Sequence, residues 1–141
     1  MKKSFSTSWK ASKQIRKQRK FRANAPLGLK RQMIVSTLSK ELRQKYNRRS
    51  FALRKGDKVL IMRGEFKKKA GKIDSVNIRK MKVIIEGIQM NKKDGTKTNV
   101  LFDPSNLKIT ELNIDDKKRI KAIKKENIKD KNKFEEKKNA S

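Results

Sequence analysis

The sequence predicts a mainly β protein, in which a small closed or half-closed barrel is flanked by basic extensions. Only residues 51–112 hold apolar side chains densely enough to enclose a core, because just 33% of the chain is hydrophobic. Within that range, turn residues separate short strand-like runs at 59–62, 72–78, 82–86, 88–90, 100–102 and 107–112. Five or six short strands favour closure of the sheet, since a barrel leaves few exposed edges.

Residues 1–24 precede the barrel and are predicted to be a basic arm that threads through RNA. The arm has nine Lys and Arg residues and no acidic residue, and it is interrupted by Phe5, Trp9, Ile15 and Phe21. These apolar residues are too few for a helix to bury, so we expect the arm to be disordered until RNA orders it. The aromatic residues favour this interpretation over a solubilising or nuclear-targeting tail, and the long basic stretch disfavours a mitochondrial presequence.

Residues 25–50 are predicted to form short helices that pack on the barrel. Pro26 suits the first turn of a helix, and the apolar residues that follow, through Leu38, are spaced partly as on one helix face. A second helix is expected at 39–46, capped by Ser39 and stopped near Asn47. Its apolar face would dock on the barrel, and its basic face would be solvated or would grip phosphate.

Turn residues set the remaining boundaries. Gly56 begins a turn before the first barrel strand, Gly87 is expected to end the strand run that precedes it, and residues 103–106 form a tight turn. Residues 113–141 predict a charged C-terminal helix or tail, which begins near two consecutive aspartates whose charge suits a helix N-terminus.

The charge of the chain restricts its partners. There are 42 Lys and Arg residues against 14 Asp and Glu residues, and the formal net charge is +28. Well over half of the excess lies in residues 1–55, which carry 18 basic residues and one acidic residue. Such a chain repels itself unless a polyanion surrounds it, and a nucleic-acid backbone is the obvious polyanion.

Composition also disfavours enzymes. The chain has no Cys and no His, which excludes disulfides, the usual zinc sites and catalysis by those side chains. Acidic residues are scattered at turns and strand ends, so no pair is placed by its spacing for acid–base work. We therefore predict no enzymatic activity, no catalytic residue, no metal and no cofactor.

The hydrophobic pattern disfavours membranes. No apolar run approaches the roughly 20 residues that span a bilayer, and the N-terminal segment lacks the apolar centre of a secretory signal. No basic stretch also has a continuous apolar face that could lie on a membrane surface. The expectation is a soluble, intracellular chain without a membrane partner.

One stretch of the predicted barrel has a specific pattern. Residues 55–67, continuing through 71–73, have the features of a strand, a basic loop bounded by glycines and a second strand. This pattern resembles a KOW motif, which implies an SH3-like barrel. Gly64 and Gly71 would permit positive φ at the two ends of the loop, and Phe66 would anchor the loop or stack on a nucleotide.

The loop differs from many KOW motifs at one position. Many members have Gly where this chain has Lys68, so the conformation of the loop there is left open. A solvated basic hairpin turn with two glycines is the alternative interpretation of the same residues. The lysines of the loop are expected to lie together on one rim of the barrel.

Segments on both sides of the motif resemble one family more closely. They are Asn24-Ala25-Pro26, residues 38–47, Arg49-Ser50, Leu53-Arg54-Lys55, residues 103–107 and residues 109–112. Together these segments resemble the universal large-subunit ribosomal protein L-twenty-four in its eukaryotic and archaeal branch, called L-twenty-six in eukaryotes. The resemblance covers roughly residues 20–120.

The resemblance implies a structural constituent of the large ribosomal subunit that binds and helps fold the large rRNA near the polypeptide exit tunnel and acts early in subunit assembly. The implied partners are large-subunit rRNA and neighbouring large-subunit ribosomal proteins, with no small-molecule substrate. The implied location is the cytosolic ribosome, with nuclear and nucleolar passage during assembly if the source is eukaryotic. A KOW-type RNA-binding transcription or ribosome-biogenesis factor is the alternative. A histone-like DNA compactor fits the charge but not the β pattern.

The candidate binding residues follow from the basic arm, the basic helices and the rim of the barrel. Phosphate contacts by such residues would position the protein, and the shape of a folded RNA would supply specificity. Three aromatic residues are candidates for base stacking, namely Trp9, Phe21 and Phe66. The predicted RNA-binding residues are Lys13, Arg16, Lys17, Arg19, Lys20, Arg22, Lys30, Arg31, Arg48, Arg49, Arg63, Lys67, Lys68, Lys69, Lys72, Arg79 and Lys80.

Overall fold

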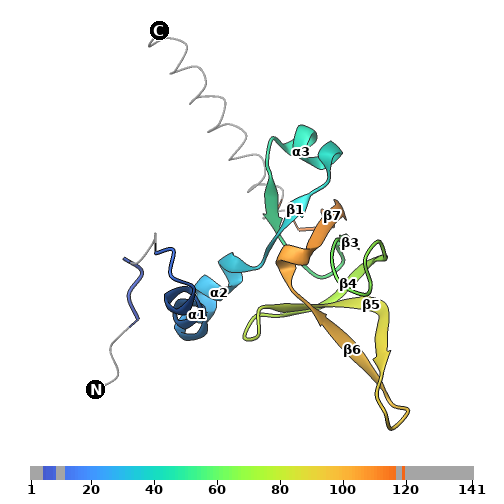
Figure 1. Cartoon of the computed structure of the whole chain (residues 1–141). Helices are drawn as coiled ribbons and strands as arrows, with labels where there is room; N and C mark the ends of the chain where they lie inside the picture. Colours follow the sequence, from blue (N-terminus) through green and yellow to red (C-terminus); the bar gives the residue numbers. More distant parts are fainter. Residues whose placement is uncertain (1–4, 9–11, 117–118, 120–141) are drawn as a thin grey trace.

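A computed structural model describes residues 5–8, 12–116 and 119, and its main feature is one mixed β sheet (Figure 1). The described strands follow the spatial order β2-β1-β7-β3-β4-β5-β6. The β1–β7 pair is parallel and the other neighbouring pairs are antiparallel. This mainly β arrangement confirms the predicted fold class and is consistent with a small SH3-like KOW fold. The strands are β1 (Val35–Leu38), β2 (Ser50–Ala52), β3 (Lys58–Ile61), β4 (Ala70–Asn77), β5 (Lys82–Asn91), β6 (Lys97–Phe102) and β7 (Leu107–Glu111).

The core consists of alternate side chains from the strands. In β3 and β7 every second residue is buried, as the two-residue period of a strand requires when one face is covered. Segments outside the strands add Ile34 and Leu53 to the same cluster. The buried core residues are Ile34, Leu38, Leu53, Val59, Ile61, Ile73, Val83, Ile85, Ile88, Phe102, Leu107 and Ile109.

Strand β1 was not predicted, because helices alone were expected in residues 25–50. The segment pairs in parallel with β7, where Leu38 lies opposite Ile109, and antiparallel with β2. Its buried residues alternate, since Ser36 and Leu38 are buried and Val35 is exposed. Buried Ser36 donates a hydrogen bond from Oγ to the Pro104 carbonyl, which ties β1 to the turn after β6. Tertiary pairing and β-branched residues therefore override the partly helical spacing.

Helix α1 (Ile15–Asn24) corrects the expectation of a disordered arm. No residue of α1 is buried, and Ile15 is 68% exposed. The helix forms from residues with high helix propensity, because Arg, Lys and Gln make up most of it. The segment was predicted to be disordered because it has no apolar face to bury, but it is helical without one. Figure 1 shows α1 next to α2, on the side of the sheet where the turn between β4 and β5 lies.

The two predicted short helices are present as α2 (Leu27–Met33) and α3 (Lys40–Tyr46). Pro26 directly precedes α2. Ser39 caps α3, because its Oγ accepts a hydrogen bond from the Leu42 N–H at 3.3 Å. Asn47 ends α3 in the left-handed conformation with φ 50°, and Leu42 packs against the core. The capping prediction and the apolar docking face of α3 are therefore confirmed.

Gly87 does not end a strand, contrary to the prediction. Strand β5 continues through Gly87, which has φ 76°, and its pairing register with β6 shifts between Ile84 and Gln89. An irregularity of this kind bends a strand without terminating it. The predicted runs at 82–86 and 88–90 are consequently one strand, and the other predicted runs each overlap an observed strand. Figure 1 shows the ends of β5 and β6 projecting from the sheet as a hairpin.

The predicted C-terminal helix over 113–141 lies outside the described residues except for 113–116 and Arg119. Residues 113–116 are neither helix nor strand. In the part of the chain that the structure describes, no helix has the length and apolar character needed to cross a membrane.

Candidate nucleic-acid interface

The loop between β3 and β4 is closed by a clasp of backbone hydrogen bonds. The Ile61 N–H donates to the Lys69 carbonyl and the Lys68 N–H donates to the Ile61 carbonyl, each with an N···O distance of 2.9 Å. Gly64 has the predicted positive φ, at 91°. This fixed backbone holds the side chains of three consecutive lysines in solvent, where a polyanion can reach them; they are Lys67, Lys68 and Lys69.

Two details of the loop correct the sequence interpretation. Gly71 does not have positive φ but is needed for close packing, since a Cβ there would lie 2.5 Å from Ile85 Cγ2 and 3.2 Å from the Glu86 carbonyl oxygen. Lys68, in contrast, has φ 70°, a conformation that glycine adopts more readily than residues with a side chain do. The loop therefore keeps a glycine-like backbone at a position that carries a lysine side chain.

Phe66 anchors the loop, which was one of its two predicted roles. Its ring packs edge-on against buried Phe102 with centroids 6.0 Å apart, and the residue is half-buried against the core. The Lys69 ammonium lies 5.1 Å from the centroid of the Phe66 ring, within the range of a cation–π interaction. Base stacking by Phe66 stays a prediction.

The candidate residues of the barrel form two groups. One group lies in and just after the loop between β3 and β4, and the other lies in the turn between β4 and β5. Strand β4, whose eight residues span roughly 25 Å, connects the loop to the turn, and Lys72 lies near its beginning. The first group is Arg63, Lys67, Lys68, Lys69 and Lys72, and the second is Arg79 and Lys80.

The cations of both groups lack a carboxylate partner among the described residues, and all seven are exposed. Other lysines of the barrel do form ion pairs. Lys58 lies 2.8 Å from Glu111 and Lys82 lies 2.7 Å from Asp103, in each case between Nζ and a carboxylate oxygen. The charge of these seven candidates is therefore left uncompensated by the carboxylates of the described residues.

The N-terminal candidates lie on and around the first helices. Those on α1 are all exposed, as is Lys13 just before the helix. Arg48 is half-buried, and its guanidinium lies 5.1 Å from the centroid of the Phe51 ring, so part of it serves packing. Of the stacking candidates, Phe21 is half-buried with its centroid 4.9 Å from that of Phe5, and Trp9 lies outside the described residues.

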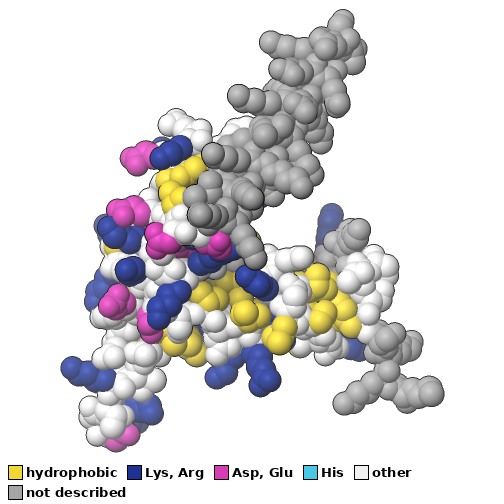
Figure 2. Space-filling model, turned by 180° about the vertical axis from the view of Figure 1, so that it is seen from behind, with side chains coloured by type: hydrophobic (Ala, Val, Ile, Leu, Met, Phe, Trp, Pro, Cys, Tyr) yellow, Lys and Arg dark blue, Asp and Glu magenta, His cyan; other side chains and the backbone are white. Residues whose placement is uncertain are grey.

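Charge on the rear face is distributed unevenly. Figure 2 shows Lys and Arg side chains over most of this face, some of them beside its hydrophobic patches, whereas Asp and Glu lie among other Lys and Arg side chains on the left side of the view. A surface of this kind attracts a polyanion over a wide area, and apolar patches between the cations can contact bases or ribose.

A buried ion pair between Asp57 and Arg119 is not among the features that the sequence predicts. The two side chains are 0% and 1% exposed, and the guanidinium binds the carboxylate in a two-pronged manner, with Nη1–Oδ1 at 2.6 Å and Nη2–Oδ2 at 2.8 Å. Arg119 also donates to the carbonyls of Asn113 and Ala52. Nothing local to Asp57 indicates a partner 62 residues away, so periodicity and motif could not reveal this contact.

Further contacts of Asp57 and Arg54 connect the segment before β3 to the segment after β7. Asp57 accepts hydrogen bonds from the Arg54 and Asn113 N–H groups, both at 2.9 Å, and Arg54 forms an ion pair with Asp116. The Arg119 guanidinium lies 5.3 Å from the centroid of the Phe51 ring. Arg54 and Arg119 are thus occupied by acids of the chain itself, unlike the cations of the loop.

A small SH3-like fold with a clasped basic loop, a basic helical arm and few compensating acids is typical of scaffold proteins that bind a polyanion. The family model for the ribosomal proteins L26 of eukaryotes and L24 of archaea matches residues 12–126. The chain therefore belongs to this family of ribosomal proteins, which confirms the resemblance drawn from the sequence.

Two relatives are both called large ribosomal subunit protein uL24. The protein from Methanosphaera stadtmanae is 42% identical over 112 residues, which cover 79% of this chain and 96% of the relative. The protein from Methanospirillum hungatei is 44% identical over 108 residues, which cover 77% of this chain and 90% of the relative. The similarity thus extends over nearly the whole of each relative.

Proposed function

We propose that this chain is a structural constituent of the large ribosomal subunit, where it binds and helps fold the large rRNA near the polypeptide exit tunnel and acts early in subunit assembly. Membership of the family and the names of both relatives support the ribosomal role. The observation that carries RNA binding is the clasped loop of exposed lysines without carboxylate partners among the described residues. The role is structural and not enzymatic.

Binding would begin with the phosphates. Each Lys or Arg that neutralises a phosphate releases a condensed counterion, so affinity falls steeply as salt rises. The loop group and the turn group lie at opposite ends of β4, so they would contact separate stretches of RNA backbone. A rigid spacing between two contact points selects a folded RNA by its shape, because A-form helices offer little sequence information to side chains.

The partners are large-subunit rRNA and neighbouring large-subunit ribosomal proteins. The protein acts in the cytosolic ribosome. If the source is eukaryotic, it first passes through the nucleus and nucleolus during subunit assembly. A domain of about 60 residues buries only about 60% of its unfolded surface, so rRNA and neighbours would add to its stability. That dependence suits a protein that joins an assembling particle.

The loop is tested by comparing two triple variants with the same change in charge. The first replaces Lys67, Lys68 and Lys69 with Gln. The second replaces three ion-paired lysines with Gln, namely Lys55, Lys58 and Lys82. Filter binding to a fragment of large-subunit rRNA over a range of salt should show the loop variant about tenfold weaker, with the salt slope shallower by about two to three.

The second variant should change affinity and slope much less, because its lysines already have carboxylate partners. Equal effects of the two variants would mean that net charge alone determines binding and would remove the loop from the mechanism. Cross-linking the protein to RNA in intact cells tests the location, with nucleotides of the large rRNA expected. Cross-links confined to other RNAs would overturn the ribosomal proposal.

A further inference from the structure

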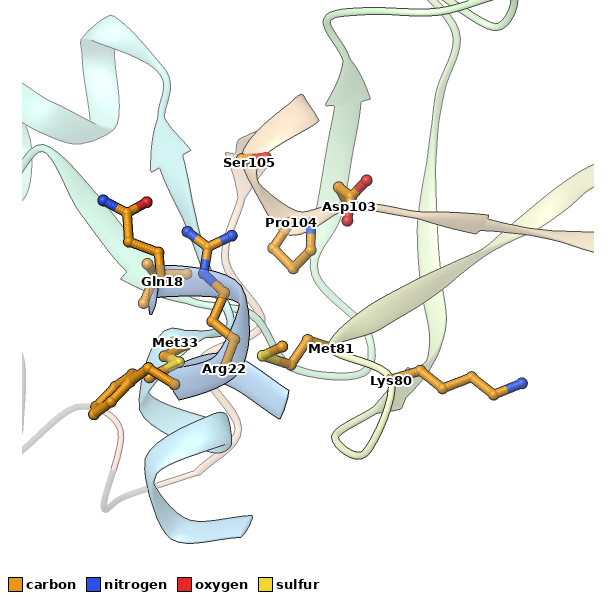
Figure 3. Close-up of a pocket in the computed structure, with 10 residues that line it drawn as sticks. Gln18, Arg22, Met33, Lys80, Met81, Asp103, Pro104 and Ser105 are labelled. Carbon is orange, nitrogen blue, oxygen red and sulfur yellow. The ribbon is translucent and has the colours of Figure 1, made fainter. Parts of the chain in front are cut away.

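A cavity of about 470 Å³ lies between the basic helix α1 and the sheet (Figure 3). Its size is within the roughly 300–1,000 Å³ that sites for small organic groups have. Its walls come from α1, α2, β1, the turn between β4 and β5, and the segment that follows β6. Arg22 of the basic arm and Lys80 of the turn between β4 and β5, which are far apart in the sequence, thus lie at the same cavity.

The walls combine apolar surface with a few polar groups. Phe21, Met33, Val35, Met81 and Pro104 supply the apolar surface. The polar groups are the side chains of Gln18, Asp103 and Ser105, and the cations are Arg22 and Lys80. An apolar cleft with scattered hydrogen-bonding groups and cations at its border suits a flat, polar-edged ring that carries phosphates on either side.

Met81 is an unusual residue for its place in this wall. Its φ is 52°, at the end of a turn in which the Met81 N–H donates to the Ile78 carbonyl at 3.3 Å and the Lys80 N–H donates to Asn77 Oδ1 at 3.0 Å. Glycine is favoured at such a position, and a long side chain there indicates a use for that side chain. Figure 3 shows the Met81 side chain extending from the turn toward Arg22, while the Lys80 ammonium points away from the cavity.

We propose that this cavity binds an unstacked nucleotide of RNA, with the base against Met81, Met33 and Pro104. Arg22 would hold a phosphate beside that nucleotide, and Lys80, whose ammonium extends outward, would meet the RNA backbone farther from the cavity. This inference rests on the proposed binding of rRNA and adds a specific site for a base that is not stacked on its neighbours. Folded RNAs offer such bases in loops and bulges, where proteins receive them on apolar surfaces. The flanking cations favour a nucleotide over an apolar protein side chain.

The decisive variant is Met81→Gly, because it removes the side chain and suits the backbone conformation. A fragment of large-subunit rRNA should bind this variant about tenfold more weakly, because the base loses one of the apolar side chains against which it packs. The salt slope should stay unchanged, since no cation is removed. Asn47→Gly is the matched control, because Asn47 also has positive φ and lies outside the cavity. It should bind as the unaltered chain does.

Binding of Met81→Gly with unaltered affinity would overturn the nucleotide site and leave the proposed function intact. The proposed function would fail separately if the unaltered chain showed no salt-dependent binding to the rRNA fragment. Thermal unfolding of both variants shows whether folding is preserved. If Met81→Gly does not fold, the methionine oxidation measurement still tests the site.

Oxidation of methionine by hydrogen peroxide gives that second measurement. With the rRNA fragment bound to the unaltered chain, Met33 and Met81 should be oxidised several-fold more slowly than in the free chain, relative to exposed Met90. No slowing by RNA would contradict the site. Protection that appears only in assembled subunits and not with the RNA fragment would assign the cavity to a protein neighbour, which also overturns the proposal.

Discussion

Arg119 and Lys68 carry the same charge in the same small protein, but their surroundings are opposite. Arg119 is 1% exposed and forms two hydrogen bonds with Asp57, whereas Lys68 is exposed and has no carboxylate partner among the described residues. Arg119 stabilises the fold, and Lys68 is available to a ligand. The formal net charge of +28 therefore includes two populations of cations, and we expect only the uncompensated one to contribute to RNA binding.

The largest expected effect comes from breaking the buried pair. Asp57→Ala leaves the Arg119 guanidinium buried without its counter-charge and removes the acceptor for two backbone N–H groups. A broken buried ion pair costs about 3–5 kcal/mol, which is most of the stability of a small domain. Urea unfolding followed by circular dichroism should show a much lower midpoint or an unfolded chain.

An exposed pair supplies the matched control. Asp74→Ala breaks the contact with Lys55, whose Nζ lies 3.7 Å from the carboxylate, and both side chains are largely exposed. The free energy of unfolding should change by less than about 1 kcal/mol. Similar midpoints for Asp57→Ala and Asp74→Ala would show that burial does not increase what an ion pair contributes to the stability of the fold.

The parts of the structure that could be predicted from the sequence depend on local interactions. Ser39 and Asn47 mark the ends of α3 through hydrogen bonding and backbone conformation within a few residues. The strands of the barrel follow from the two-residue period and from turn residues between them. The loop lysines were found in the same way, because Gly64 and the charges around it are adjacent in the sequence.

The parts that could not be predicted depend on partners far away in the sequence. Strand β1 exists because β7 pairs with it across about 70 residues, and its own spacing partly resembles a helix. The partner of Asp57 at position 119 has no local signal, and neither does the meeting of Arg22 with Lys80 at one cavity. The sequence also did not predict that the barrel cations form two groups, because that depends on the length and direction of β4 in the sheet.

Lys68→Gly sharpens the comparison, because its effects on folding and on binding should have opposite signs. A residue with a side chain adopts φ 70° at a cost of about 1–2 kcal/mol, and glycine removes this cost. Part of the gain is cancelled, because glycine also increases the conformational entropy of the unfolded chain. We expect the free energy of unfolding to rise by roughly 0.5–1 kcal/mol. RNA affinity should fall a few-fold, since one uncompensated cation is lost.

Lys68→Ala separates the two contributions. It removes the same charge but keeps a Cβ at the strained position, so RNA affinity should fall as in Lys68→Gly without a gain in stability. Urea unfolding and salt-dependent filter binding on the three proteins measure both quantities. A loss of stability in Lys68→Gly would show that the lysine side chain contributes to the fold and belongs to the same population as Arg119.

The smallest expected effect concerns an acid at the tip of the β5–β6 hairpin. Asp94 accepts hydrogen bonds from Thr96 Oγ1 at 2.6 Å and from the Thr96 N–H at 2.9 Å, and the hydroxyl contact is the main cause that lowers the pKa of Asp94 below 3.8. The carboxylate is thus held within its own turn, while the exposed lysines of the tip have no carboxylate partner among the described residues; they are Lys92, Lys93 and Lys97.

Thr96→Val removes the hydroxyl and should raise the pKa of Asp94 toward 3.8, as measured by NMR titration of its carboxyl carbon. A folded-state pKa below that of the unfolded chain means that ionised Asp94 stabilises the tip above pH 3.8, and that this contribution is lost as the pH falls through the folded-state pKa. The variant should therefore weaken the tip above pH 3.8 and leave the unfolding of the barrel unchanged. An unchanged pKa would mean that the hydroxyl is not what holds the carboxylate, and that the backbone N–H of residue 96, which the variant keeps, or a nearby lysine does.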